Sequence, residues 1–362
     1  MLLLSILIFL ILPLHGGSCS TDLDCSLNGI CDVSLSTCQC DQPWTGGSCE
    51  TLSYSPSTPA IAKSLYNISD PRNTWNGPIY GPGSDGKYHI YVPLYNVGSL
   101  ATPTTMKHGI ADTITGPWDF TSLPDISTEG GENPAMVVYS DASRGGSLSF
   151  TLWIGGSVLL SDSPYGPFNK VSSFSYPGGN PAPIYHNGAF FMTNQQTEQI
   201  YTTPSLIPGA KWSIYSNISH EALPQDEYHV EDPFLWVDRR GNWHIINHAY
   251  SNYQYDNCSN SYVSAHFFSG DNGMTWLWSS QPYGHLVQYD DGTSHNYVTL
   301  ERPNLHFSPT GEMTHLNLAA DLVTTGDIGC MNRTDHSHFG HCPCDNCKWN
   351  DHAGTIIIAL GV

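Results

Sequence analysis

The stretch EDPFLWVDRRGNWHIINHAY, residues 231–250, joins an acidic pair and a proline to two apolar runs separated by a polar turn. The segment GNWHIINHAY alternates apolar and polar residues, which is the period of two that a half-buried β-strand shows. Two such runs on either side of a Gly-containing turn predict a β-hairpin. Residues 231–250 therefore predict two paired strands that begin at an acidic step.

The same unit recurs along the chain. It appears as NGPIYGPGSDGKYHIYVPLY from Asn76, ENPAMVVYSDASRGGSLSFTLWIGG from Glu132, GNPAPIYHNGAFFMTNQ from Gly179 and ERPNLHFSPTGEMTHLNLAA from Glu301. A repeat of about fifty residues with several strands per unit is typical of propeller blades. The sequence therefore predicts an all-β chain with a five-bladed β-propeller over residues 66–362. A β-sandwich explains the recurring proline step less well. The repeat prolines are Pro78, Pro134, Pro181, Pro233 and Pro303.

The charge balance limits the classes of partner. The 362 residues include 12 Lys plus Arg and 32 Asp plus Glu, which gives a net charge of −20. So few cations disfavour binding to a nucleic acid or to an anionic membrane surface. The many Gly, Pro and aromatic residues favour a folded, turn-rich β protein over a disordered one.

The amino terminus indicates export. MLLLSILIFLILPLHGGSCS has a short apolar run followed by small residues, which predicts a signal peptide over residues 1–18. A membrane anchor is the alternative, but the run is shorter than the roughly 20 residues that span a bilayer. Eleven cysteines fit an oxidising compartment, so we expect a secreted protein without a transmembrane segment. Four Asn-x-Ser/Thr sequons agree with secretion: Asn67, Asn217, Asn257 and Asn332.

Six cysteines lie within residues 19–50. A module of this size buries too little apolar surface to fold without cross-links. The Cys-x-Cys step and the ending PWTGGSC resemble an epidermal growth factor-like module. That resemblance implies three disulfides and either an adhesion role or, as we favour, a stapled cap on the next domain. Residues 51–65 are expected to be a linker. The implied pairs are Cys19–Cys31, Cys25–Cys38 and Cys40–Cys49.

The propeller repeat resembles glycoside hydrolase family 43 and its five-bladed relatives in families 32 and 62. The resemblance rests on the repeat itself, on EDPFLW, and on the GPW and GPF turns at Gly116 and Gly166. It implies a general acid two places before a later proline, where Glu231 stands. It also implies aspartates directly before the first and third prolines, where this chain has Gly77 and Asn180. Two of the three expected carboxylates are therefore missing.

Glycoside hydrolysis needs two carboxyl groups in different protonation states. In a propeller, the residues before each repeat proline converge on the axis, so acids far apart in sequence become neighbours. An amide has no titratable proton near neutrality and cannot replace the missing base. Asp70, which also precedes a proline, is a second option for that base. The alternative is that these carboxylates only cap the backbone where strands begin. The candidate catalytic residues are Glu132, Glu231, Asp232 and Glu301.

Other residues near the axis are candidates for sugar binding. Indole rings stack on the apolar faces of pyranoses, and Arg can bind a hydroxyl or an acidic sugar. No cofactor is required for this chemistry, although an acidic channel can bind calcium through oxygen ligands. His295 precedes the fifth repeat, and relatives often place a histidine there near a bound cation. The candidate substrate-binding residues are Trp75, Asn76, Asn180, His295 and Arg302.

A second group of cysteines and histidines spans residues 330–352. In an exported protein these cysteines favour disulfides over zinc ligation. Cys258 and Cys330 are a plausible pair, and the pairing of Cys342, Cys344 and Cys347 stays open.

Two functions follow from these patterns. The first is a secreted hydrolase that cleaves a polysaccharide with paired carboxylates. The second is a non-catalytic carbohydrate-binding protein on a degenerate hydrolase fold, which the amides Asn76 and Asn180 favour. An extracellular adhesion protein that binds a protein partner through the cysteine module is a further alternative.

Overall fold

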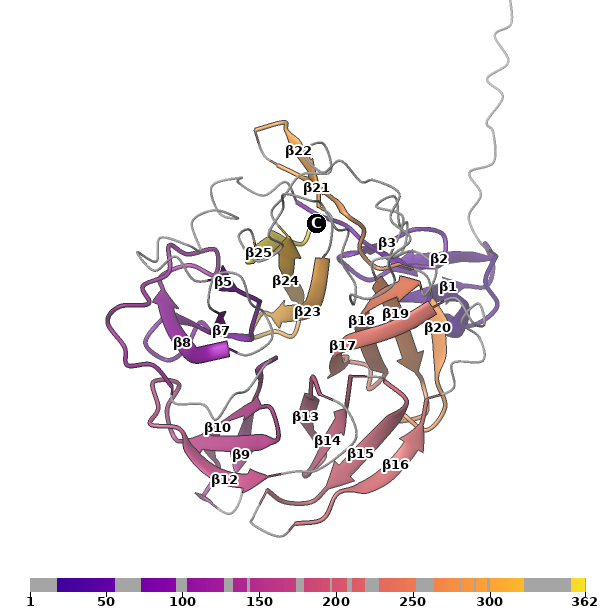
Figure 1. The fold of residues 1–362 in the computed structure, drawn as a ribbon. Coiled ribbons are helices and arrows are strands. Elements are labelled where there is room, and N and C mark those ends of the chain that lie inside the picture. Colours follow the sequence, from indigo (N-terminus) through magenta and orange to yellow (C-terminus); the bar gives the residue numbers. More distant parts are fainter. Residues whose placement is uncertain are drawn as a thin grey trace, which may run out of the picture.

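The computed structural model describes fourteen segments, coloured in Figure 1. Among the sequence predictions, several lie outside the described residues: the signal peptide up to residue 17, Asp70, Glu132, the Cys258–Cys330 pair, the cysteines at 342, 344 and 347, and the sequons at 67, 257 and 332. The described segments are residues 18–55, 73–95, 103–126, 133–141, 144–173, 179–195, 197–206, 210–218, 228–251, 264–279, 281–289, 291–297, 300–321 and 353–361.

Five antiparallel sheets stand around one axis, which confirms the five-bladed propeller (Figure 1). Blade 1 contains β5 (Asn73–Thr74), β6 (Ile79–Tyr80), β7 (Tyr88–Tyr95) and β8 (Pro103–Ala111). Blade 2 contains β9 (Ala135–Asp141), β10 (Ser147–Ile154), β11 (Ser157–Ser161) and β12 (Asn169–Ser173). Blade 3 contains β13 (Ala182–His186), β14 (Ala189–Thr193), β15 (Gln199–Thr203) and β16 (Ser213–Asn217).

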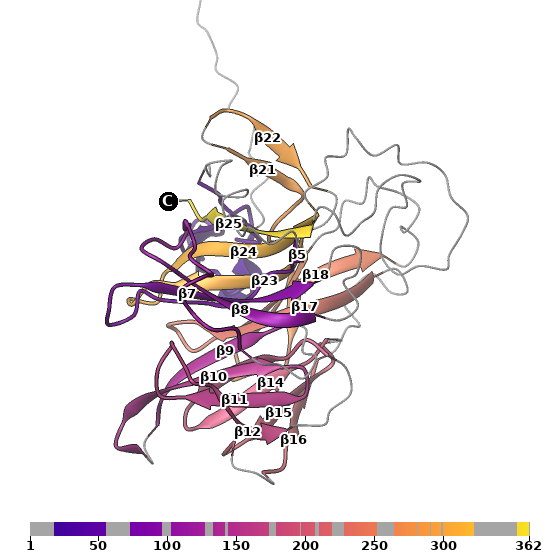
Figure 2. The same ribbon diagram turned by 60° about the vertical axis from the view of Figure 1, so that its left-hand side comes forward.

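The last two blades follow the same order. Blade 4 contains β17 (Tyr228–Val237), β18 (Trp243–Ser251), β19 (Ser264–Ser269) and β20 (Leu277–Ser279). Blade 5 contains β23 (Leu300–Phe307), β24 (Met313–Asp321) and β25 (Ala353–Ala359). Between them the hairpin of β21 (Leu286–Gln288) and β22 (Ser294–Asn296) projects from the ring (Figure 1, Figure 2). No helix among the described residues is long and apolar enough to cross a membrane.

Every blade contains the same backbone step close to its repeat proline. One residue there has a left-handed conformation, with φ between 50° and 54°. Asn and Asp tolerate this conformation better than other residues with a Cβ. In blades 4 and 5 the pairing register shifts across the step, between Glu231 and Phe234 and between Glu301 and Asn304. Such a bulge re-aims side chains at the sheet end. The five residues are Asn76, Asn133, Asn180, Asp232 and Arg302.

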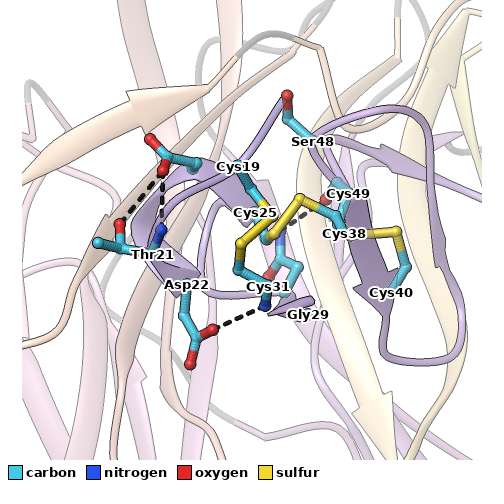
Figure 3. The surroundings of a disulfide bond; sticks show 12 residues. Cys19, Thr21, Asp22, Cys25, Gly29, Cys31, Cys38, Cys40, Ser48 and Cys49 are labelled. Carbon is cyan, nitrogen blue, oxygen red and sulfur yellow. Dashed lines mark hydrogen bonds between the residues drawn. A yellow bond between two sulfur atoms is a disulfide. The ribbon is translucent and has the colours of Figure 1, made fainter. Parts of the chain in front are cut away.

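The three N-terminal disulfides have the expected pairs, Cys19–Cys31, Cys25–Cys38 and Cys40–Cys49 (Figure 3). They hold a short 3₁₀ helix, η1 (Asp22–Cys25), and two small sheets. In Figure 3 the Asp22 carboxylate accepts a hydrogen bond of 2.8 Å from the Cys31 backbone N–H. The sheets pair β1 (Gly29–Asp32) with β2 (Thr37–Cys40), and β3 (Trp44–Thr45) with β4 (Thr51–Leu52).

This N-terminal module, residues 18–52, packs against blade 4, where Figure 1 draws its strands beside β19 and β20. Trp44 is buried, and its ring centroid lies 5.1 Å from that of His266. Arg240 forms an ion pair of 2.6 Å with Asp41 and donates a hydrogen bond of 3.2 Å to the Gly29 carbonyl. These contacts support the prediction that the module caps the propeller.

The chain just after the module closes the ring. Tyr54 pairs with Leu360, and the Ser55 N–H donates a hydrogen bond of 2.9 Å to the Ala359 carbonyl. The Gly361 N–H returns a bond of 2.8 Å to Ser53. Residues 53–55 therefore add an outer edge to blade 5, although they belong to the stretch that the sequence predicts to be a linker. An early segment thus pairs with the last blade.

Replacing Trp44 by Ala is expected to lower the free energy of unfolding of the whole chain by about 3–5 kcal/mol, because a buried indole contact between module and propeller is lost. Chemical denaturation followed by circular dichroism measures it. Leu35→Ala is the control on the same module: Leu35 is 69% exposed, so its change should stay within about 0.5 kcal/mol. A propeller transition unaffected by Trp44→Ala would show that module and propeller unfold independently.

Candidate active site

Three of the predicted acids meet at the axis. Glu231 and Asp232 lie at the bulge of β17, and Glu301 lies at the equivalent bulge of β23. Together with His248 of β18, each offers an oxygen or nitrogen atom within 4.8 Å of the others. We call these four residues the acidic cluster. The fourth predicted acid, Glu132, lies outside the described residues.

A small cavity of about 160 Å³ lies on the axis and is lined by the step residues of all five blades. The repeats thus bring side chains from distant parts of the sequence to one place. Asp232 belongs both to this axial cavity and to the acidic cluster. The step residues are Asn76, Asn133, Asn180, Asp232 and Arg302.

Glu231 is more exposed than its neighbours in the acidic cluster: its side chain is 23% exposed, compared with 11% for His248 and 3% for Asp232. Gln195 Nε2 donates a hydrogen bond of 3.0 Å to Glu231 Oε2, and His248 Nδ1 lies 3.4 Å from Oε1. Burial alone would raise the pKa of Glu231, but His248, Gln195 and the Arg302 charge outweigh it and lower the pKa to about 2. Glu231 is therefore ionised at neutral pH.

Asp232 has the opposite electrostatics, although it is the next residue. Its side chain is almost fully buried, and burial raises its pKa to about 7, against the opposing effect of Arg302 and with the help of the Glu231 charge. Asn180 donates a hydrogen bond to Asp232 Oδ1, and Arg302 Nε lies 3.6 Å from Oδ2. In mildly acidic solution Asp232 therefore holds a proton beside an ionised Glu231.

His248 is a site residue that the sequence analysis missed. Burial would lower its pKa, but the surrounding carboxylates of Glu301, Glu231 and Asp232 raise it to about 9. It faces Glu231 directly in the β17–β18 register. Counting the hairpin pairs outward from the turn in DRRGN would have found this partner, provided that the bulge at Asp232 was recognised.

Gln195, in the β14–β15 connection, was also missed. Its Nε2 binds Glu231, and its Oε1 accepts a hydrogen bond of 3.3 Å from the Gly179 N–H. Both ends of the amide are therefore used, which fixes its orientation. The polar run TNQQ carries no period that would mark Gln195 as an axial residue.

The predicted sugar contacts near blade 1 have defined structural partners. Asn76 is buried, and its Nδ2 donates hydrogen bonds to the carbonyls of Arg302 (2.5 Å) and Asn317 (2.9 Å). Its Oδ1 accepts a bond of 2.8 Å from Asn317 Nδ2, so its amide links blade 1 to blade 5. Trp75 is also buried, with the Arg302 guanidinium 5.8 Å from its ring centroid. Trp75 and Asn76 both line the axial cavity.

Gly77, directly before the first repeat proline, is the position at which the sequence analysis expects an aspartate, although the left-handed residue of blade 1 is Asn76. A Cβ at this position would lie 1.8 Å from the Tyr91 carbonyl oxygen, so no residue with a side chain fits without moving the backbone. The absence of that carboxylate is therefore imposed by the packing of blade 1.

Two further predicted residues lie away from the acidic cluster. His295 is on the β21–β22 hairpin, where its ring centroid lies 4.4 Å from that of Tyr297, and it does not line the axial cavity. Asn217 of the sequon NIS ends β16 and is exposed, so a glycan could be attached there. Its glycosylation stays a prediction.

The acidic cluster does not match the ligands that calcium prefers. Calcium takes six to eight oxygen ligands, whereas the cluster contains an imidazole whose pKa is raised and a nearby guanidinium. Calcium stays a sequence prediction, and none of the chemistry below uses it.

His248 predicts a pH dependence of stability. The folded chain retains the His248 proton up to about pH 9, whereas the unfolded chain releases it near the ordinary value of 6.5. Its contribution is therefore complete below pH 6.5 and is lost as the pH rises toward 9, by at most about 1.4 kcal/mol per pH unit. Denaturant titrations between pH 7.5 and 9, above the pKa of about 7 of Asp232, should show this slope in the wild type and not in His248→Gln.

His186→Gln is the matched control for this experiment. Burial lowers the pKa of His186, so it is neutral above pH 6.5 in both folded and unfolded chains and adds no slope there. Equal slopes in the wild type and His248→Gln would contradict the assigned ion pair with Glu231.

The chain is similar to known proteins in structure but not in sequence. No protein-family model matches the sequence, and no curated protein matches it significantly. A thermostable family-43 glycoside hydrolase shares 15% identity, with 74% of this chain and 86% of that chain covered and a TM-score of 0.46. An endo-arabinase from Bacteroides thetaiotaomicron shares 10% identity, with 85% of this chain and 98% of that chain covered and a TM-score of 0.49. A family 117 glycoside hydrolase from Zobellia galactanivorans also shares 10% identity, with 86% of this chain and 89% of that chain covered and a TM-score of 0.46. Likeness at this level carries no argument about activity.

Proposed function

We propose that this protein hydrolyses glycosidic bonds of a polysaccharide at the acidic cluster. One observation carries the proposal: the carboxyl groups of Glu231, Asp232 and Glu301 meet at the propeller axis, with atoms within 4.8 Å of one another. Their surroundings lower the pKa of Glu231 and raise that of Asp232. Carboxyl groups with separated pKa values are what glycoside hydrolysis uses, since one group holds a proton and another is ionised.

Glu231 is the group best placed to meet a substrate, because Asp232 lies deeper. The family resemblance makes Glu231 the proton donor, whereas its surroundings favour the ionised form. His248 reconciles the two, since its raised pKa leaves a proton at Nδ1, 3.4 Å from Glu231 Oε1. A bound sugar would exclude water and raise the energy of this ion pair. The proton can then pass from His248 to Glu231 and on to the leaving oxygen as the glycosidic bond breaks.

The group that activates water is less well defined. Inverting enzymes separate their carboxyl groups by roughly 6.5–9.5 Å to admit a water molecule. The described acids have atoms within 4.8 Å of one another and all come from blades 4 and 5. Across the axis, blades 1–3 present Asn76, Asn133 and Asn180. The sequence analysis offers Asp70 and Glu132 as an opposing carboxylate, and both lie outside the described residues.

Those three amides favour a second candidate function, glycan binding without hydrolysis. An amide cannot remove a proton from water, but it can donate to and accept from sugar hydroxyls. The amide of Asn76 is already bonded to blade 5, so this role would fall to Asn133 and Asn180. In this function the acidic cluster would bind hydroxyl groups. The predictions of secretion and of an extracellular glycan apply equally to both functions.

The variant Glu231→Gln distinguishes hydrolysis of a glycan from glycan binding without hydrolysis. If the protein is a hydrolase, the variant should lose activity on arabinan, xylan or an algal glycan by at least about a hundredfold, because the amide cannot transfer the proton. Reducing-end release measures this loss. Asp112→Asn, an exposed carboxylate of blade 1, is the control and should leave turnover unchanged.

Binding is measured on the same glycans. A wild type that binds one of them but releases no product would identify the binding function instead. Equal hydrolysis by the wild type and Glu231→Gln would exclude Glu231 from the chemistry.

A further inference from the structure

A second cavity lies between the N-terminal module and the far ends of the inner strands. Its volume is about 520 Å³, within the range of about 300–1,000 Å³ typical of small-molecule sites. It shares Met136, Phe234 and Leu235 with the axial cavity, so the two adjoin along the axis. None of the four residues of the acidic cluster lines it. We call it the module cavity.

Aromatic side chains provide apolar surface in the module cavity. Phe234 and Phe307 come from the inner strands of blades 4 and 5, and their rings are 6.5 Å apart and only 19° from parallel. Tyr185 of blade 3 lines the same space, and all three are only half-buried. Apolar faces of sugar rings pack against surfaces of this kind.

Exposed polar side chains surround that apolar surface. The module contributes Asp41 and Gln42, and the propeller contributes Arg239, Arg240 and Glu312. Carboxylate, amide and guanidinium groups are planar and can each make two hydrogen bonds, which suits neighbouring hydroxyl groups on a sugar. Arg240 is already bonded to Asp41 and Asp238 and to the backbone carbonyls of Leu27 and Gly29, so it holds this wall together. Gln42, Arg239 and Glu312 are the groups better placed to bond a ligand.

The charge of the module cavity points to a neutral ligand. Asp41, Asp238 and Glu312 supply three negative charges, and Arg239 and Arg240 supply two positive ones. His244, which also lines the cavity, has a pKa lowered by burial and carries no charge at neutral pH. The net charge of −1 disfavours uronic acids and sulfated sugars.

From this apolar surface and its polar border we infer that the module cavity is a second saccharide-binding site for a neutral sugar. The site exists only where the module is docked, because Asp41, Gln42 and Trp44 form one of its walls. Binding there requires no member of the acidic cluster, so this inference does not depend on the proposed hydrolysis.

Met313→Trp tests the inference by filling the cavity. Met313 lines it from the start of β24 and is half-buried, so the larger indole has room only by occupying ligand space. Met274→Trp is the matched control, because Met274 is 50% exposed on the turn before β20 and lies outside the cavity. Equal melting temperatures of both variants and the wild type establish that folding is unchanged.

The probes are xylobiose, arabinobiose and galactobiose, with galacturonic acid as the anionic comparison. Calorimetry and ligand-observed NMR on the full chain measure their binding. We expect one neutral disaccharide to bind, Met313→Trp to weaken it by about tenfold or more, which is about 1.4 kcal/mol, and Met274→Trp to leave it unchanged. Galacturonic acid should bind more weakly than the neutral probes.

Glu231→Gln separates this site from the acidic cluster. Binding that is weakened by Met313→Trp but retained in Glu231→Gln supports the module cavity, whether or not the chain hydrolyses glycans. The inference is overturned if none of the neutral probes binds, if Met313→Trp binds like the wild type, or if only Glu231→Gln removes binding.

Discussion

The left-handed backbone step beside each repeat proline is the constraint on which the rest of the structure depends. Five residues take this conformation, and all five line the axial cavity. An extended chain would instead alternate its side chains between the two faces of the blade. Because of the step, Asn180, Asp232 and Arg302 meet at the axis, and Asp232 comes within reach of Glu301 and His248. The same five steps thus form the propeller axis and assemble the acidic cluster.

Much of this arrangement could be predicted from the sequence. A repeat of about fifty residues predicts the number of blades, and its proline marks the position at which each inner strand reaches the axis. Five blades and the meeting of Glu231, Asp232 and Glu301 followed from it. The asparagines were harder to interpret, since Asn is favoured in a left-handed step for backbone reasons and also looks like a lost carboxylate. His248 depends on cross-strand register, which a bulge shifts. Gln195 and the pairing of residues 53–55 with blade 5 come from segments without periodicity, so only the coordinates place them.

The carboxylates at the axis also explain why His248 and Arg302 stand beside them. Three carboxylates within 4.8 Å repel one another strongly when they are buried. His248 and Arg302 compensate that repulsion, and His248 does so only because its neighbours raise its pKa. Arg302 stands where three other blades have Asn, and a left-handed conformation costs a residue of this kind roughly 1–2 kcal/mol. The contacts of the Arg302 guanidinium offset that strain, since it lies 3.6 Å from Asp232 and above the Trp75 ring. A residue chosen for backbone geometry alone would be Asn.

The N-terminal module belongs to the same argument, because a ring of blades must be held where its first and last segments meet. Residues 53–55 pair with the end of blade 5, and the disulfide-linked module just before them is fixed to blade 4 by Trp44 and Arg240. Pairing residues 53–55 with residues 359–361 closes a loop of about three hundred residues, which is entropically unfavourable. The disulfide-linked module next to residues 53–55 limits how far this segment can move away from blade 5. The module is too small to be stable through its own core, and the propeller supplies the surface that it lacks. Their mutual burial stabilises both, and the module cavity is the space that their docking leaves open.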